Sequence, residues 1–398
     1  MRRIPARFHE SLPRQIYRVA SVDQLVGEWT PVLRYLVKIT SEDDAATLAQ
    51  LAASGIRNIV GFSDETRDCK PERECPIILG QLGSLTLDDV IVPNAERGEI
   101  SVLFRESDAH HSVLLTNRCN SHCLMCSQPS TRQSDSWLVD EAIGIARYIR
   151  QSPASIGLTG GEPLLLGAEL RQVIDVYRQT HPDTSLDVLT NGRLLSDKSL
   201  ADTLLSGLRD GKTSWLVPLY GHADFLHDFI VQSRGAFEET IDGLLALQAQ
   251  AQPIQLRIVL VKPVLQILPE LCRFIGRNLP FVREVALMAC EPFGFAVANR
   301  EICETDLADW HRQLQEAATS LQRADVPFLV MNTPLCVLPQ NLWPMARRSI
   351  SDWKQDFTVE CQACALKDTC AGLFAWHNQG WRPGTIKTIG MRKGVTPP

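Results

Sequence analysis

Between residues 111 and 332 the sequence alternates short apolar, β-branched runs with longer segments of helical periodicity. This alternation predicts parallel strands joined by crossover helices, in an α/β layer or barrel. Six strand–helix units can be counted, whereas a closed (β/α)8 barrel needs eight, and a further helix (304–323) and strand (327–332) follow. The predicted strands are 111–117, 155–160, 186–192, 214–221, 254–261 and 284–290, and the predicted helices are 138–151, 167–180, 197–208, 235–250 and 266–278.

The segments on either side of this alternation have a different character. The N-terminal part holds one helical pattern, at 43–54, and several short β-like runs, which predict a small α+β domain. From residue 333 the chain is rich in Cys, Pro and Trp and shows no clear periodicity. We therefore predict three domains: an N-terminal domain (1–105), an α/β core (106–332) and a cysteine-rich extension (333–398).

Composition narrows the class of protein. The chain has 398 residues, 44% of them hydrophobic and 22% charged, with a net charge of −6. These values exclude a disordered, collagen-like or coiled-coil chain, and the mild acidity argues against nucleic acid as the main partner. The most apolar long stretch, 256–272, is interrupted by Arg257, Lys262 and Glu270. We expect no membrane span, no signal peptide and a cytoplasmic location.

The chain contains 12 cysteines, and their spacing is uneven. In a reducing compartment, clustered cysteines indicate metal ligands or catalysts before disulfides. Two dense groups stand out, at 119–126 and 361–370. We expect the isolated Cys272, Cys290 and Cys303 to be buried as small hydrophobic residues. Cys69 and Cys75 lie in a polar segment predicted to be a loop.

The first group has the spacing C-x3-C-x2-C and directly follows the first predicted strand of the core. A structural zinc site normally takes four protein ligands, and only His122 is near enough in sequence to add one. A [4Fe–4S] cluster has four irons, each of which takes a thiolate. With Cys119, Cys123 and Cys126 alone, one iron keeps an open position for a ligand from solution.

The second motif, LTGGEP, ends the second predicted strand. Gly160 and Gly161 allow a close approach of the backbone, and Glu162 offers a carboxylate to an ammonium group. An ordinary strand-to-helix turn would explain the same residues. However, ligands in α/β folds gather at the carboxyl ends of strands. We therefore expect this motif and the three cysteines to face one pocket.

Together, the C-x3-C-x2-C and GGEP motifs resemble those of the radical S-adenosylmethionine (SAM) superfamily over roughly residues 110–300. The resemblance implies a partial (β/α)6 TIM-like barrel in which the three cysteines hold a [4Fe–4S] cluster whose open iron chelates SAM. It also implies that Gly160–Glu162 receive the methionine amine, and that a 5′-deoxyadenosyl radical abstracts hydrogen from the substrate. Met125 stands where the superfamily often has an aromatic residue.

Three further residues of the core are candidates for the SAM pocket. Asn191 ends the third predicted strand, Ser233 opens a helix in a phrase that resembles one common in the superfamily, and Arg257 lies on the fifth strand. A turn asparagine, a helix N-cap and a structurally paired arginine are the respective alternatives. The sequence assigns no catalytic side chain beyond the cofactor ligands.

The C-terminal cysteines predict a second metal centre. Cys361-x2-Cys364-x5-Cys370 resembles the SPASM and twitch extensions that hold auxiliary iron–sulfur clusters, although Phe374 stands where a full SPASM tail has another cysteine. Cys336 is the nearest thiol upstream and would complete four ligands. We predict an auxiliary [4Fe–4S] cluster, with a four-cysteine zinc site as the alternative.

The phrases TNRCNSHCLMCSQP, LTGGEPLLL, NTPLCVLP and SISDW give a closer resemblance, to the His-Xaa-Ser system radical SAM maturases of the C type (HxsC). This resemblance implies a ribosomal peptide substrate with His-Xaa-Ser repeats, a partner radical SAM protein and an external electron donor. The alternatives are a radical SAM enzyme that acts on RNA or a small metabolite, and a non-catalytic iron–sulfur or zinc protein.

Overall fold

The structure, a computed structural model, describes residues 2–9, 12–64, 75–377 and 381–390. The chain divides into two compact units. The first comprises Met1–Val113, Trp137–Ala154 and Asp175–Thr184, and the second comprises Leu114–Ser136, Ser155–Ile174 and Ser185–Pro398. The first unit thus takes in part of the segment predicted as core. Cys69 lies outside the described residues.

The N-terminal part of the first unit is a closed barrel with the strand order β1-β5-β4-β3-β2-β6-β7. The predicted helix at 43–54 is α2, which begins after a capping box formed by Ser41 and Asp44. The sequence pattern missed β1, β2, α1 and β3. The elements are β1 (Arg2–Phe8), β2 (Tyr17–Ala20), α1 (Val22–Glu28), β3 (Tyr35–Lys38), α2 (Glu42–Ala53), β4 (Ile59–Ser63), β5 (Ile77–Gly80), β6 (Val90–Asn94) and β7 (Glu99–Phe104).

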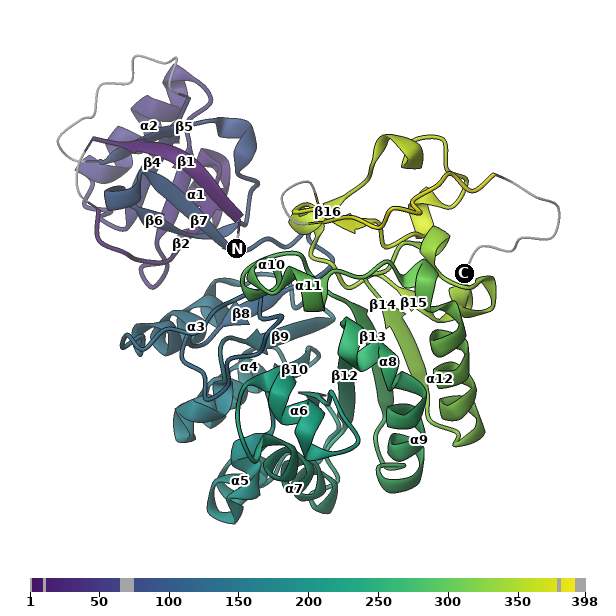
Figure 1. The fold of residues 1–398 in the computed structure, drawn as a ribbon. Helices are drawn as coiled ribbons and strands as arrows, with labels where there is room; N and C mark the ends of the chain where they lie inside the picture. The colour runs from purple at the N-terminus through teal and green to yellow at the C-terminus, as the bar shows by residue number, and fades with distance from the viewer. Residues whose placement is uncertain (1, 10–11, 65–74, 378–380, 391–398) are drawn as a thin grey trace. The chain divides into compact units, whose positions relative to one another are not determined.

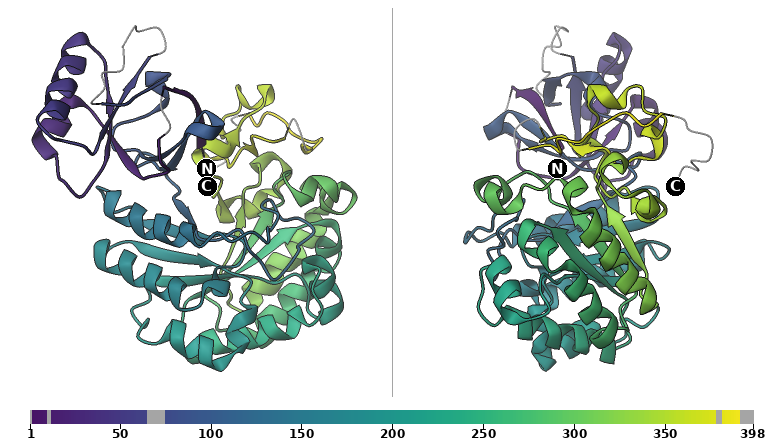
Figure 2. Two further views of the ribbon diagram at one scale, coloured as in Figure 1. Left: turned by 90° about the vertical axis from the view of Figure 1, so that its left-hand side faces the viewer. Right: turned by 45° about the vertical axis from the view of Figure 1, so that its right-hand side comes forward.

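An eight-stranded sheet, in the order β15-β14-β13-β12-β11-β10-β9-β8, forms the core of the second unit (Figures 1 and 2). The pairs from β9 to β15 are parallel. All six predicted strands are present, and β14 and β15 extend the sheet. The strands are β8 (Ser112–Leu114), β9 (Ser155–Thr159), β10 (Ser185–Leu189), β11 (Thr213–Pro218), β12 (Ile254–Leu260), β13 (Glu284–Ala289), β14 (Phe328–Met331) and β15 (Ala346–Arg347).

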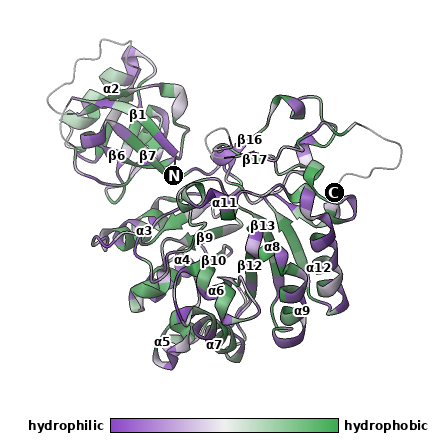
Figure 3. Ribbon diagram, viewed as in Figure 1, coloured by the Kyte–Doolittle hydropathy of each residue, from purple (hydrophilic) through white to green (hydrophobic). Residues whose placement is uncertain are grey.

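Helices cover one face of this sheet (Figure 1). In β10, for example, Leu186 and Val188 are buried whereas Asp187 and Leu189 are half-buried, as expected when alternate side chains point to opposite faces. Figure 3 shows that residues of β12–β14 are mostly hydrophobic, while α9 and α12 contain both hydrophobic and hydrophilic residues. The helices are α3 (Trp137–Tyr148), α4 (Ala168–Thr180), α5 (Lys198–Leu205), α6 (Asp224–Val231), α7 (Ala236–Ala249), α8 (Lys262–Gln266), α9 (Leu268–Asn278), α10 (Phe295–Ala298), α11 (Arg300–Cys303) and α12 (His311–Arg323).

The extension after residue 332 consists of turns, 3-10 helices and very short strands. It is continuous with the core, because β15 pairs with β14 at the edge of the large sheet. A two-stranded ladder, β16 (Gln355–Asp356) with β17 (Leu373–Phe374), brings residues far apart in the extension together. None of the helices in the described residues is long and apolar enough to cross a membrane.

Candidate functional site

The first cysteine group lies in a loop that follows β8; we call residues 116–126 the cysteine loop. Hydrogen bonds from His122 N–H to Val231 O (3.0 Å) and from Leu124 N–H to Ile230 O (2.9 Å) attach it to the end of α6. Cys126 N–H donates to Cys123 O (3.0 Å), which closes a turn between two of the thiols. The three cysteines are free and half-buried. These backbone hydrogen bonds attach the loop to the helix that follows β11.

Burial dominates the electrostatics of these thiols. It raises the pKa of Cys119 to about 11 and that of Cys123 to about 12, and it also raises the pKa of Cys126. The negative charges of neighbouring cysteines raise the pKa of Cys119 and Cys123 further. The thiols are thus close enough to repel one another as thiolates. A bound cation would relieve that repulsion, as expected for a set of metal ligands.

A buried carboxylate fixes the start of the cysteine loop. Asp135 is 5% exposed, and it accepts hydrogen bonds from Thr116 Oγ1 (3.1 and 3.2 Å) and from the backbone N–H of Asn117. Arg118 Nε lies 3.3 Å from the same carboxylate. A buried charge is retained when it is paired and hydrogen-bonded in this way. The sequence analysis did not identify Asp135, which lies nine residues beyond Cys126 with no recognisable motif around it.

The two glycines of the GGEP motif are required by the chain itself. A Cβ on Gly160 would lie 2.4 Å from Thr116 O, and one on Gly161 would lie 2.1 Å from Arg118 O. Gly161 N–H donates to Thr116 O at 2.7 Å. The sequence argument assigned this close approach to a ligand; in the structure it joins the end of β9 to the cysteine loop. The two motifs are therefore adjacent, as expected.

The carboxylate of Glu162, which was predicted to receive an ammonium group, is hydrogen-bonded within the chain. Its side chain is fully buried, and its carboxylate accepts hydrogen bonds from Thr190 Oγ1 (2.5 Å), Asn191 N–H (2.6 Å) and Leu164 N–H (2.9 Å). Burial raises the pKa of Glu162, and these donors lower it. The carboxylate thus braces the ends of β9 and β10. The half-buried backbone of Gly160 and Gly161 is the part of the motif that a ligand can reach.

Asn191 and Arg193 connect the end of β10 to the cysteine loop. Asn191 Nδ2 donates to Asn120 Oδ1 at 2.6 Å. The buried Arg193 donates from Nη1 to Asn120 O (2.7 Å) and Ser121 Oγ (2.9 Å), and from Nε to Glu239 Oε2 (2.6 Å). Its positive charge also lowers the pKa of Cys123. Sequence reasoning identified Asn191 and missed Arg193, whose only signal was its position next to a TNG turn.

Ser233 and Arg257, the other two candidates for the SAM pocket, are less directly connected to the cysteine loop than Asn191 is. Ser233 lies in the turn between α6 and α7, where its N–H donates to Asp228 O. Arg257, on β12, donates from Nε to Gln255 Oε1 (2.9 Å), and burial lowers its pKa. Within the described chain, neither side chain is hydrogen-bonded to the cysteine loop. Tyr220 has electrostatic interactions with both Cys123 and Arg257, and burial raises its pKa well above the usual value.

The C-terminal cysteines come together in the fold. Cys336, Cys361, Cys364 and Cys370 line one cavity; the space between its lining atoms amounts to about 370 Å³, part of which is open to solvent. We call it the four-cysteine cavity. Cys370 Sγ accepts hydrogen bonds from the backbone N–H groups of Leu335 and Gly372, both at 3.4 Å. The gap in sequence after Cys336 is therefore bridged by the tertiary structure.

Zinc and an iron–sulfur cluster are the two candidate occupants of the cysteine groups. Among the described residues, no three or more His, Cys, Asp or Glu side chains lie close enough together to hold one metal ion. Tetrahedral zinc requires four ligands within about 2.3 Å of a single ion. The four thiols of the cavity match in number either one zinc ion or the four irons of a [4Fe–4S] cluster.

The isolated cysteines of the second unit are buried, as predicted. Two of them, however, interact: the pKa values of Cys290 and Cys303 are each shifted by the other thiol. Cys303 Sγ also donates to Leu124 O in the cysteine loop at 3.7 Å. Sequence reasoning missed this contact because the two residues belong to different elements, at the end of β13 and in α11. Cys75 is buried in the hydrophobic core of the first unit.

Comparison with known proteins supports the identity of this region. Residues 113–274 match the Radical SAM superfamily. A probable GTP 3′,8-cyclase from Methanocella arvoryzae is 32% identical over 155 residues, which cover 38% of this chain and 48% of that protein. The chain therefore aligns with about half the length of this curated relative. Residues 113–274 are thus similar in sequence to the Radical SAM superfamily.

Solved structures show a looser likeness. Streptococcus suis SuiB bound to precursor peptide SuiA has a TM-score of 0.45 at 15% identity, covering 57% of this chain and 49% of that chain. A radical SAM methyltransferase from Sphaerobacter thermophilus has a TM-score of 0.42 at 16% identity, covering 61% and 72%. Likeness at this level carries no information about substrate.

Proposed function

We propose that this protein is a radical SAM maturase that modifies a ribosomally made peptide bearing His-Xaa-Ser repeats. The observation that carries the radical SAM part is the cysteine loop: three half-buried thiols within eight residues, joined by backbone hydrogen bonds to the glycine turn that ends β9. Both features lie at the carboxyl ends of parallel strands, where ligands of such folds bind.

Cys119, Cys123 and Cys126 would hold the [4Fe–4S] cluster, and the backbone of Gly160 and Gly161 would line the place of the SAM amino group. When bound, the cluster supplies the electron that splits SAM and releases a 5′-deoxyadenosyl radical. The chain's own contribution is positioning and exclusion of water.

The four-cysteine cavity would hold an auxiliary [4Fe–4S] cluster. Four thiols supply one ligand to each iron, and backbone N–H donors to a ligand sulfur, as at Cys370, are a known way to tune such clusters. Zinc is the alternative occupant, because four cysteines also form a tetrahedral structural site.

The peptide substrate, the partner radical SAM protein and the external electron donor rest on the sequence resemblance to HxsC proteins. Co-expression of this chain, its partner and the repeat peptide under anaerobic conditions is expected to change the mass of the peptide. An unmodified peptide, from protein shown to contain its clusters and to cleave SAM, would contradict the proposed substrate.

A second candidate function is action on a nucleotide or another small metabolite, favoured by the sequence match to a probable GTP 3′,8-cyclase. Incubation of the reconstituted protein with SAM, a reductant and either GTP or the repeat peptide separates the two. Stimulated SAM cleavage and a new product with GTP alone would favour the second candidate. A protein that cleaves no SAM under any condition would instead favour a non-catalytic metal protein.

A further inference from the structure

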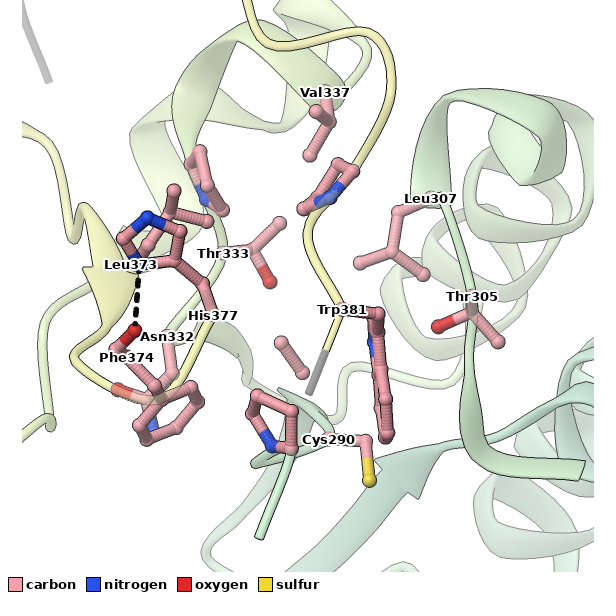
Figure 4. A pocket seen from close by; sticks show the side chains of 14 residues that line it. Cys290, Thr305, Leu307, Asn332, Thr333, Val337, Leu373, Phe374, His377 and Trp381 are labelled. Atoms are coloured by element: carbon pink, nitrogen blue, oxygen red, sulfur yellow. Dashed lines mark hydrogen bonds between the residues drawn. The ribbon is translucent and has the colours of Figure 1, made fainter. Parts of the chain in front are cut away.

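A pocket lies at the carboxyl ends of β13 and β14, beneath the extension (Figure 4). We call it the strand-end pocket. The space between its lining atoms amounts to about 460 Å³, part of which is open to solvent. Leu307, Val337 and Trp381 form apolar walls, and none of the fourteen described residues that line it is Asp, Glu, Lys or Arg. A charged ligand group would therefore lose its hydration without gaining a counter-charge, which disfavours it.

Among the described residues that line this pocket, His377 Nε2 and the indole N–H of Trp381 have no hydrogen-bond partner. The side chain of His377 is 7% exposed, and its Nδ1 lies 3.1 Å from Phe374 O (dashed line in Figure 4). A carbonyl oxygen only accepts hydrogen bonds, so Nδ1 carries the proton and Nε2 of the neutral ring is an acceptor. In the described part of the chain, Nε2 has no hydrogen-bond partner. Asp356 Oδ2, 3.6 Å from Nδ1, favours the same tautomer.

Two hydroxyl groups of the pocket, like His377 Nε2, are hydrogen-bond acceptors toward a ligand. Thr333 Oγ1 donates to Met331 O at 3.1 Å, and Thr305 Oγ1 donates to Leu260 O at 3.3 Å. Each hydroxyl hydrogen is therefore used within the protein, and the oxygen lone pairs remain as acceptors. Together with His377, they suit a ligand group that brings an O–H or N–H donor.

The pocket lies between the two predicted metal sites. On one side, Cys290 lines it and interacts electrostatically with Cys303, whose thiol donates to Leu124 O in the cysteine loop. On the other side, Pro334 and Leu373 line both this pocket and the four-cysteine cavity. A group held here is next to both centres.

Resting on the proposed function, we propose that the strand-end pocket binds one uncharged side chain of the polypeptide substrate, whose O–H or N–H donates to His377 Nε2. A serine hydroxyl and a neutral imidazole both satisfy this requirement. A lysine, arginine or carboxylate side chain does not. His377 is thus a specificity residue for the modified segment.

Small probes test the chemistry of the pocket without reference to any peptide. 4-Methylimidazole at pH 8.5, where imidazoles are neutral, is added to the cluster-replete protein and followed by ligand-observed NMR, with propylammonium as a charged probe of similar size. We expect 4-methylimidazole to bind, His377→Phe to weaken it at least fivefold, and the pocket-filling Leu307→Trp to abolish it. Leu245→Trp, on the exposed side of α7, is the control. Equal binding of propylammonium, or binding unaffected by Leu307→Trp, overturns the proposal.

Peptides then separate this inference from the proposed function. A His-Ala-Ser repeat peptide is compared with versions in which Lys replaces His, in which Ala replaces Ser, and in which both are replaced, using variants with wild-type iron content and thermal stability. We expect His377→Phe to weaken binding of the repeat peptide but not of a peptide lacking the donor. If His377→Phe and Leu307→Trp modify the peptide as wild type does, the pocket assignment fails and the proposed function stands. If wild type binds 4-methylimidazole but neither binds nor modifies the peptide, the peptide substrate fails.

Discussion

The two cysteine groups of this protein are built in different ways. The cysteine loop is an insertion between a strand and a helix, and buried charged residues, Asp135 and Arg193, attach it to the barrel. The four-cysteine cavity lies in an extension of turns and short 3-10 helices, where backbone N–H groups of Leu335 and Gly372 donate to the sulfur of Cys370. One group has three thiols in a rigid frame, and the other has four thiols in an irregular one.

The difference indicates what each centre is suited to do. Three thiols leave a coordination position for a substrate or cofactor, and a rigid frame keeps that position oriented toward the strand ends. Four thiols close the coordination shell, so the extension can hold a metal group without offering a reactive site. The predictions below test this contrast, from the largest expected effect to the smallest.

The largest effect is expected from loss of a single thiol in the cysteine loop. Cys123→Ala should reduce reductive SAM cleavage to the background of protein-free reactions, because a two-thiol site cannot hold the SAM-binding cluster. The measurement is 5′-deoxyadenosine formation by liquid chromatography. Cys272→Ala, at a buried thiol of α9, is the control and should retain activity. Normal 5′-deoxyadenosine production by Cys123→Ala would exclude the loop as the SAM site.

The reactivity of the thiols should distinguish the loop from ordinary cysteines. With a pKa of about 12, Cys123 in the metal-free protein has roughly a 10³-fold smaller thiolate fraction at pH 8 than a free cysteine, and should be alkylated correspondingly slowly. Mass spectrometry of peptides after iodoacetamide treatment measures this rate. Because the folded pKa exceeds that of the unfolded chain, the unfolded state loses the proton first. The metal-free fold should therefore lose stability as the pH rises above about 8.5. Rapid alkylation at pH 8 would show that the loop is not buried.

Arg193 should matter more to the cysteine loop than to the fold. Arg193→Gln removes a buried cation and hydrogen bonds to the loop, and should lower SAM cleavage about tenfold while destabilising the protein by about 2 kcal/mol. Arg193→Lys keeps the charge but not the geometry of the guanidinium group. Its rate of SAM cleavage should fall between those of wild type and Arg193→Gln. The iron content and the cluster's midpoint potential provide readouts beyond activity.

The matched control for Arg193 is Arg171→Gln, which removes hydrogen bonds to the carbonyl groups at the end of α5. It should cost similar stability and leave the cluster potential unchanged. An equal shift of the potential in both variants would mean that Arg193 acts only through general stability.

The smallest effect is a twofold change in iron. A triple variant with Ala at Cys119, Cys123 and Cys126 should keep about four irons of the eight expected from two [4Fe–4S] clusters. Further replacement of Cys336 should remove most of the remainder. Zinc in the triple variant would preserve the ligand set but contradict an iron–sulfur cluster in the extension.

Local sequence patterns were sufficient to predict the strand–helix alternation of the core. Hydrophobic residues that recur every two positions in a strand, or about every 3.6 in a helix, are visible in short stretches of sequence. Such patterns were insufficient for the N-terminal barrel, where β1 pairs with β5 and β7, because such closure depends on contacts between residues far apart in sequence. The pairing of β15 with β14 was missed for the same reason: a two-residue strand has no periodicity of its own.

The sequence alone determined the chemistry available to this protein. The spacing of Cys119, Cys123 and Cys126 sets three thiols within eight residues, and the adjacent Gly160 and Gly161 mark a close backbone approach, because both are properties of consecutive residues. Only the tertiary structure decided what surrounds that chemistry. It buried the Glu162 carboxylate among three donors, placed Arg193 against the cysteine loop, and collected Cys336 with three cysteines more than twenty residues away. These arrangements depend on which strands become neighbours, and that choice is made by the packing of the whole sheet.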